Sequence, residues 1–233
     1  MAKVIILSGA GISAESGIST FRDTDGLWEQ YDIEDICTDG CLDTNYNETI
    51  EFYDKRRADI KDKVPNHAHI KIAELKDKYQ DDIAILTQNV DDLFEKANCK
   101  AVLHLHGFLK EVRCMECDTI TDIGYMNQND AIKYCSKCNG RIRPNIVFFG
   151  ESAPMYEMLN HHIQDCEFLV VIGTSGNVIG VNTMASFTDT SILNNLEPSS
   201  AIDDTVFSKV LYKKASEAID EIVEDIEEYL NKK

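Results

Sequence analysis

Four cysteines carry the strongest chemical signal in the sequence. They are spaced C-x2-C-x17-C-x2-C, at Cys114, Cys117, Cys135 and Cys138. Each C-x2-C turn can present two thiolates to one ion, and four thiolates complete the tetrahedral coordination of a structural zinc ion. Two redox pairs or disulfides are the alternative, which a reducing compartment disfavours. The other cysteines lack metal-ligand spacing and are expected to be buried or incidental thiols: Cys37, Cys41, Cys99 and Cys166.

A glycine-rich turn follows the apolar run from Val4 to Leu7. Residues 9–14, GAGISA, fit the pattern G-x-G-x-x-G/A, in which glycines permit a tight turn and the close approach of a pyrophosphate. A turn of the same kind without a ligand is the alternative, because the pattern alone is weak. Residues 20–28, TFRDTDGLW, are predicted to form a loop where a dehydrogenase has its second strand, and the next predicted strand starts near Ile83.

Short apolar runs predict the strands that must position these residues. They are rich in β-branched residues and alternate with helical segments, as in a parallel sheet covered on both faces, and they lie at residues 3–7, 83–86, 102–105, 146–149 and 168–172. Apolar residues at helical spacing predict helices over residues 65–79 and in the tail, from Ala218 to Leu230. The predicted fold is therefore α/β, with a doubly wound, Rossmann-like parallel sheet.

Two segments interrupt the alternation of strands and helices and predict a smaller lobe. The Rossmann-like domain is predicted from residues 1–29, 83–112 and 144–233. A helical insertion over residues 30–82 and a four-cysteine zinc ribbon over residues 113–143 are predicted to form the small lobe.

Composition restricts the class of partner. The chain of 233 residues has a formal net charge of −18, which argues against nucleic-acid binding and favours a cationic peptide. No apolar run approaches the length of about 18 residues that a membrane span needs. The apolar segment near the start of the sequence is too short for a signal peptide, so we expect a cytoplasmic protein. The oligomeric state is not fixed by the sequence, and a monomer is compatible with it.

Six stretches in register resemble the sirtuin family of NAD-dependent protein deacylases over nearly the whole chain. They are GAGISAESGISTFRD from residue 9, TQNVD from residue 87, LHG from residue 105, the cysteine quartet, IRPNIVFFGE from residue 142 and IGTSGN from residue 172. The resemblance implies an NAD-binding domain, one structural zinc ion and NAD consumed as a co-substrate. The implied partners are acyl-lysine proteins or peptides, and the implied products are nicotinamide and O-acyl-ADP-ribose.

The resemblance also implies the cofactor contacts. Two glycine turns and a loop arginine would face the dinucleotide phosphates: Gly9, Ala10, Gly11, Arg22, Gly173, Thr174 and Ser175. Gln88 and Asn89 would contact the nicotinamide ribose, Asp91 would hold the carboxamide, and Asn195 would meet the adenine ribose. Phe21 would shield the reacting ribose carbon from water until the nucleophile arrives.

The catalytic residues implied by the resemblance are His106, Asn89 and Asp91. His106 is the predicted base that deprotonates a ribose hydroxyl, a step that suits a pKa near 7. His104, two residues earlier on one strand face, is its competitor, but Gly107 matches His106 to the family motif. The remaining histidines are expected to be structural or exposed: His67, His69, His161 and His162.

Tyr53 and Arg56 lie three residues apart on one predicted helical face. On their own they fit a core-edge tyrosine beside a solvated arginine, but sirtuins that prefer succinyl, malonyl or glutaryl lysine share this Tyr-x-x-Arg. A guanidinium and a phenol can bind a terminal carboxylate, so we expect desuccinylation or demalonylation to exceed deacetylation. Cys37 replaces the small Ala usual in that subset and would narrow the pocket. The remaining expected substrate contacts are Val147, Phe149 and Gly150.

The chain departs from the family pattern mainly near the adenine end. The departures are Ser19 for a usual Pro, Asp92 for Gly, residues 180–182 for a stretch containing Pro, and Lys213 for Gly. Two other functions remain as alternatives: an NAD glycohydrolase or ADP-ribosyltransferase on the same scaffold, and a non-enzymatic NAD sensor whose zinc ribbon engages a partner.

Overall fold

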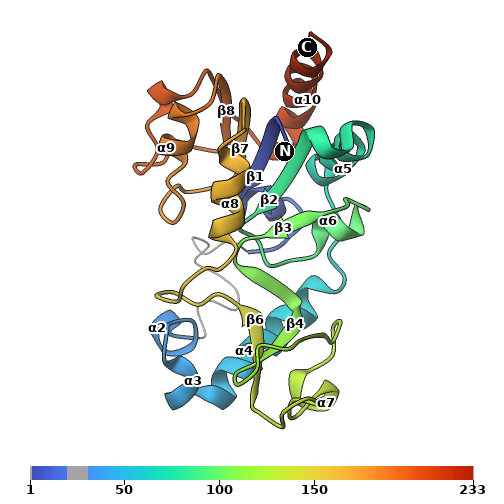
Figure 1. Cartoon of the computed structure of the whole chain (residues 1–233), viewed down its shortest axis with the longest axis vertical. Coiled ribbons are helices and arrows are strands. Elements are labelled where there is room, and N and C mark those ends of the chain that lie inside the picture. Colours follow the sequence, from blue (N-terminus) through green and yellow to red (C-terminus); the bar gives the residue numbers. More distant parts are fainter. Residues whose placement is uncertain (1, 20–30, 233) are drawn as a thin grey trace.

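The computed structural model describes residues 2–19 and 31–232 and divides them between two lobes (Figure 1). The large lobe contains a parallel sheet of six strands among the described residues, in the order β3-β2-β1-β7-β8-β9. The strands are β1 (Val4–Ser8), β2 (Ile83–Thr87), β3 (Val102–His104), β7 (Phe168–Ile172), β8 (Thr190–Asn195) and β9 (Lys209–Tyr212). From β1 the chain adds β2 and β3 on one side and β7, β8 and β9 on the other. Doubly wound folds bind their ligands at this switch point, between β1 and β7.

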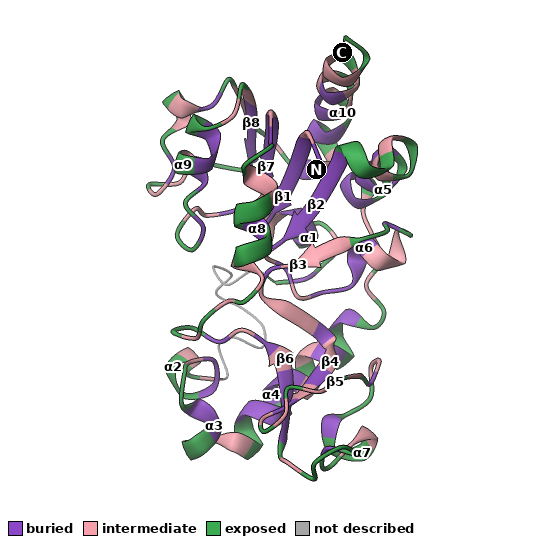
Figure 2. Ribbon diagram, viewed as in Figure 1, coloured by how far each residue is buried: buried purple, intermediate pink, exposed green. Residues whose placement is uncertain are grey.

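The central strands are buried over their whole length, as Figure 2 shows. Alternate side chains of β1 enter different cores: Val4 and Ile6 pack against α5 (His67–Tyr79) and α10 (Ala215–Asn231). Ile5 and Leu7 pack on the opposite face, against α8 (Tyr156–Ile163) and α9 (Val181–Ser186). Burial on both faces explains the continuous apolar runs, and the predicted doubly wound fold is confirmed.

The small lobe joins short helices to an antiparallel sheet of three strands in the order β5-β4-β6 among the described residues. Its strands are β4 (Gly107–Cys114), β5 (Ile120–Asp122) and β6 (Ile142–Ile146), and its helices are α2 (Ile33–Ile36), α3 (Cys41–Thr44), α4 (Tyr46–Ile60) and α7 (Gln128–Ala131). Residues 146–149 were expected in the parallel sheet, and this expectation is wrong. The chain reverses through the cysteine turns and pairs Ile142 with Cys114, so β6 lies antiparallel to β4.

The described residues include four further short helical segments. They are α1 (Gly11–Ala14), α6 (Leu93–Lys96), η2 (Gln80–Asp82) and η3 (Asp204–Val206). Of the helices in the described ranges, none has both the length and the apolarity needed to cross a membrane. The domain ranges given above remain predictions.

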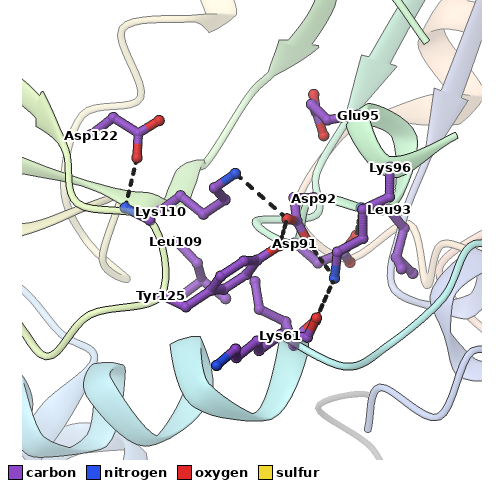
Figure 3. Close-up of polar contacts among 12 residues, drawn as sticks. Lys61, Asp91, Asp92, Leu93, Glu95, Lys96, Leu109, Lys110, Asp122 and Tyr125 are labelled. Carbon is purple, nitrogen blue, oxygen red and sulfur yellow. Dashed lines mark hydrogen bonds and ion pairs between the residues drawn. The ribbon is translucent and has the colours of Figure 1, made fainter. Parts of the chain in front are cut away.

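A buried carboxylate ties the two lobes together (Figure 3). Asp92 precedes α6, and its side chain accepts a hydrogen bond from the Tyr125 hydroxyl of the small lobe. Lys96 Nζ lies 3.2 Å from Asp92 Oδ1, and Lys110 Nζ of β4 lies 3.8 Å from Oδ2. Lys96 Nζ also donates to the carbonyl oxygens of Ile60, the last residue of α4, and of Lys61 and Lys63, which follow it. Asp92, a departure from the family pattern, is thus an interlobe contact.

Candidate active site

The predicted cofactor residues meet at the carboxyl ends of four neighbouring parallel strands. Gly9, Ala10 and Gly11 follow β1, Gln88 to Asp91 follow β2, Gly173 to Ser175 follow β7, and Asn195 ends β8. Side chains cross between these ends: Gln88 Nε2 donates to Thr174 Oγ1 over 3.0 Å, and Asn195 Nδ2 donates to the carbonyl oxygen of Thr174 over 2.9 Å. The fold therefore brings together residues that are up to 186 positions apart (195 minus 9).

The two glycine turns after β1 and β7 interlock. Gly11 N donates to the carbonyl oxygen of Gly173 over 2.8 Å. A Cβ on Gly11 would lie 2.7 Å from Gly173 Cα, and one on Gly173, whose φ is +64°, would lie 2.5 Å from Ile12 N. Only glycine permits this approach. This contact holds the two turns side by side at the carboxyl ends of β1 and β7, where doubly wound folds bind a dinucleotide, so the residues present fit NAD.

Ser13 connects two of the predicted catalytic residues. Its hydroxyl donates to Asp91 Oδ2 and accepts from Asn89 Nδ2, each over 2.9 Å. Burial raises the pKa of Asp91, while hydrogen bonds from the Leu93 N–H and from Ser13 oppose that shift. Ser13 is fully buried and was missed as a site residue by the sequence analysis, although it lies within the glycine motif.

His106 lies between the two lobes, two residues after β3 and directly before β4. Its Nδ1 is 3.0 Å from the carbonyl oxygen of Gln88 and its Nε2 is 2.8 Å from the hydroxyl of Tyr156. Burial lowers the pKa of His106, so the ring is neutral at pH 7. Gly107 has φ +89°, and a Cβ there would lie 1.9 Å from the carbonyl oxygen of Asn145 on β6. The Gly after His106 is therefore required by strand contact.

His104 is committed to other partners. Its Nδ1 is 2.9 Å from the carbonyl oxygen of Asn89, and its Nε2 is 3.0 Å from Glu95 Oε1. Burial lowers the pKa of His104, but the hydrogen bond and charge of Glu95 outweigh it, and the net shift is upward. Because Nε2 of His104 is paired with a carboxylate, this ring supports the loop after β2 and is a poorer candidate for the base than His106, whose Nε2 faces a neutral hydroxyl.

The predicted acyl-binding residues gather on α4. Tyr53 is 2 % exposed, stacks on Phe148 at 5.5 Å between ring centroids, and donates a hydrogen bond to Cys37 Sγ over 3.4 Å. Burial raises the pKa of Cys37 to about 11, so its thiol keeps its proton at pH 7. Half-buried Arg56 lies one helical turn further, and burial lowers its pKa while Tyr53, Cys37 and Asp91 counteract the shift. A guanidinium remains charged under these conditions.

The segment 147–150 joins this cluster to His106 through its backbone. Val147 N donates to the carbonyl oxygen of His106 over 2.9 Å, and Phe149 N donates to that of Cys37 over 2.8 Å. Asp39 N donates in turn to the carbonyl oxygen of Phe149 over 2.8 Å. Phe149 and Gly150 are exposed. The expected substrate segment thus runs from the predicted base to the predicted acyl pocket.

The four cysteines of the zinc motif converge in the small lobe, where Cys114 ends β4. All four Sγ atoms lie within 4.8 Å of one another, and three of the distances are 3.3, 3.4 and 3.6 Å. Zinc–sulfur bonds of about 2.3 Å in a tetrahedron place sulfur atoms about 3.8 Å apart. The cluster fits one zinc ion, which these thiolates would hold with a closed coordination shell. Cys37, Cys41, Cys99 and Cys166 are buried elsewhere.

Two predicted residues, Phe21 and Arg22, lie outside the described residues. Tyr156 is the second residue that the sequence analysis missed, and no motif marks it.

His67 is exposed and paired with Asp220, and His69 is fully buried, as expected for histidines outside the site. Lys213 Nζ contacts Glu221 Oε2 over 2.6 Å on α10.

Comparison with known proteins places the chain in a family. The Sir2 family model matches residues 9–180. An NAD-dependent protein deacylase of Campylobacter jejuni is 46% identical over 231 residues, which cover 99% of this chain and 98% of that relative. A mutant Sir2 homologue solved with ADP ribose superposes with a TM-score of 0.84 at 31% identity, covering 99% of this chain and 94% of the other.

A more distant solved structure is Sir2 in complex with an inhibitor, 2′-O-acetyl-ADP-ribose and a deacetylated p53 peptide. It has a TM-score of 0.73 at 27% identity and covers 95% of this chain and 93% of the other. The resemblance of the six motifs is thereby confirmed over nearly the whole length, and the chain belongs to the Sir2 family.

Proposed function

We propose that this protein removes acyl groups from lysine side chains of proteins, consumes NAD, and prefers succinyl or malonyl lysine to acetyl lysine. The products are nicotinamide and O-acyl-ADP-ribose. The name of the Campylobacter relative and the ADP-ribose and peptide ligands of the solved Sir2 structures support the deacylase activity. The acyl preference rests on the cluster of Tyr53, Arg56 and Cys37.

The site supports a division of labour between its two halves. The glycine turns and Thr174, Ser175 and Asn195 bind the dinucleotide, and Phe21 and Arg22 are expected to contribute to its binding. Asn89 and Asp91 hold the nicotinamide end. The acyl oxygen of the substrate replaces nicotinamide at the ribose carbon, a ribose hydroxyl then attacks the activated acyl carbon, and one water molecule is consumed as the lysine amine leaves and the acyl group remains on the ribose.

His106 is the proposed base for that attack. Since the Gln88 carbonyl oxygen can only accept a hydrogen bond, the neutral imidazole carries its proton on Nδ1 and leaves Nε2 basic. The lowered pKa keeps this form populated at pH 7. The carbonyl oxygen of His106 also accepts a hydrogen bond from Val147 N in the proposed substrate segment. This hydrogen bond would position the acyl-lysine relative to the base.

The acyl preference follows from charge. Arg56 supplies a cation beside the buried Tyr53 phenol, an arrangement suited to a terminal carboxylate. An acetyl group offers no charge to this cation, so burial of Arg56 brings no benefit to acetyl binding. Cys37 lies next to the Tyr53 hydroxyl, and a side chain larger than Ala there would narrow the pocket and favour malonyl over longer acyl groups.

The deciding experiment is a panel of matched acetyl, malonyl and succinyl peptides assayed with NAD by mass spectrometry. Replacing Arg56 by Met (Arg56→Met) should lower kcat/KM for succinyl and malonyl peptides about 10- to 100-fold, the value of a charge-assisted hydrogen bond. It should leave acetyl turnover unchanged. Cys37→Ala should raise succinyl relative to malonyl turnover.

Lys55→Met is the matched control, because Lys55 is an exposed cation on the same helix that pairs with Glu51. An enzyme that prefers acetyl peptide and is indifferent to Arg56→Met contradicts the acyl preference. Nicotinamide release that needs no acyl peptide identifies a glycohydrolase, and NAD binding without turnover identifies a sensor.

A further inference from the structure

The basic nitrogen of His106 already has a partner. Tyr156, the first residue of α8, places its hydroxyl oxygen 2.8 Å from His106 Nε2, and the ring centroids are 5.8 Å apart. The proton of the neutral imidazole is on Nδ1, where the Gln88 carbonyl oxygen accepts it. Nε2 therefore accepts a hydrogen bond from the Tyr156 hydroxyl.

The position of Tyr156 is set by the large lobe. Tyr156 N donates to the carbonyl oxygen of Ala153 over 3.1 Å, which closes the turn that starts α8. Leu159 is buried in the core under α8, and Met155 and Tyr156 pack against the same core. Burial raises the pKa of Tyr156, so the phenol retains the proton that it donates. The contact with His106 thus belongs to a packed element.

We propose that Tyr156 is a positioning residue that occupies the basic nitrogen of His106 in the free enzyme and is displaced by the ribose hydroxyl of NAD. The inference rests on the proposed role of His106 as base. A phenol O–H on Nε2 imitates the O–H of the substrate, because both groups donate to the same lone pair. It holds the imidazole in its reactive tautomer and keeps Nε2 directed toward the site until the ribose arrives.

Nitrogen-15 NMR of the histidine rings tests the contact directly. Tyr156→Phe removes only the hydroxyl, so the Nε2 resonance of His106 should shift while its Nδ1 resonance, still bonded to Gln88, stays in place. The His106→Ala spectrum assigns both signals by their disappearance. In the wild-type enzyme, saturation with ADP-ribose should also shift the Nε2 resonance, because a ribose hydroxyl takes the place of the phenol.

Steady-state kinetics test the displacement. If the ribose hydroxyl must replace the Tyr156 hydroxyl, Tyr156→Phe lowers the KM for NAD at saturating acyl peptide by about 2- to 10-fold, the range of a net hydrogen bond, and leaves kcat within about twofold. Tyr229→Phe is the control. That tyrosine lies on α10, across the sheet, and its hydroxyl bonds Glu167.

The outcomes separate this inference from the proposed function. Unchanged Nε2 resonances in Tyr156→Phe and in the ADP-ribose complex, or an unchanged KM for NAD, overturn the role of Tyr156 while deacylation continues. Full activity of His106→Ala overturns the role of the base itself. If Tyr229→Phe changes the KM for NAD as much as Tyr156→Phe does, the effect comes from a general loss of structural stability, and the proposal is overturned.

Discussion

Ser13 and Asp91 are joined by a hydrogen bond of 2.9 Å between the first glycine turn and the loop after β2. The same hydroxyl accepts from Asn89, so one serine orients both side chains proposed to hold the nicotinamide end. Ser13→Ala should lower kcat/KM about 10- to 100-fold, because two buried polar groups lose a partner. Ser186→Ala, an exposed serine on α9, is the control. Activity of Ser13→Ala within twofold of wild type would contradict this role.

Asp92 should stabilise the arrangement of the two lobes. Its side chain is 2 % exposed and faces Lys96, Lys110 and the hydroxyl of Tyr125. Asp92→Asn removes the negative charge and leaves two ammonium groups beside a neutral amide. We expect the free energy of unfolding in urea to fall by about 1–3 kcal/mol, since both lysines retain some contact with water. Asp122→Asn, an exposed residue of β5 (Figure 3), should cause little change.

His69 should make stability depend on pH. Both ring nitrogens lack a hydrogen-bond partner among the described residues, and the ring packs against Phe94 at 4.9 Å. Burial lowers its pKa from 6.5 to about 4. The unfolded chain therefore binds more protons between these values, so stability is full above pH 6.5 and falls as the pH drops toward 4.

The pKa shift of His69 should lower the free energy of unfolding by about 3 kcal/mol at low pH, since each pKa unit corresponds to about 1.4 kcal/mol. Urea unfolding of the wild type and of His69→Leu at pH 7 and pH 4.5 measures it. The variant should lose the part of the pH dependence that His69 contributes, whereas His67→Ala, which changes an exposed histidine, should keep it. Equal slopes for wild type and His69→Leu would show that another group is responsible.

Removal of zinc should unfold the small lobe. We expect about one zinc ion per chain by atomic emission and a lower thermal midpoint after chelation, because binding to four thiolates contributes directly to folding. Deacylation should then fail, since β6 leads directly into the substrate segment 147–150. Cys138→Ser should lower the zinc content, and Cys166→Ala, outside the cluster, should not. A zinc-free wild-type protein with an unchanged midpoint argues against a structural ion.

The sequence predicted those parts of the fold in which local pattern and burial coincide. The apolar runs of β1, β2 and β7 are buried on both faces, so their composition alone predicted them as buried strands of a parallel sheet. Residues 146–149 have a similar composition, yet Ile146 ends β6 of the small sheet and residues 147–149 lie outside the strands of both sheets. The cysteine turns reverse the chain and bring β6 beside β4, so they determine which strand β6 pairs with. The composition of β6 alone carries no information about this pairing.

The candidate site also contains residues that the sequence predicted and residues that it did not. Residues within motifs, such as Gln88, Asn89 and Thr174, were predicted and lie together. Tyr156 was missed because its role depends on α8 meeting the connection between β3 and β4, a contact between segments 50 residues apart. The Asp92 network was visible only as a departure from the family pattern, since its partners come from both lobes.

The interlocked glycine turns have a consequence for synthesis on the ribosome. Gly11 rests on Gly173, and β1 pairs with β7 along its whole length, from Val4 with Phe168 to Ser8 with Ile172. A nascent chain that carries the complete first turn must therefore wait for more than 160 further residues before its neighbour emerges. Until then the apolar β1 has an open edge, and the nucleotide-binding surface cannot form on any shorter fragment.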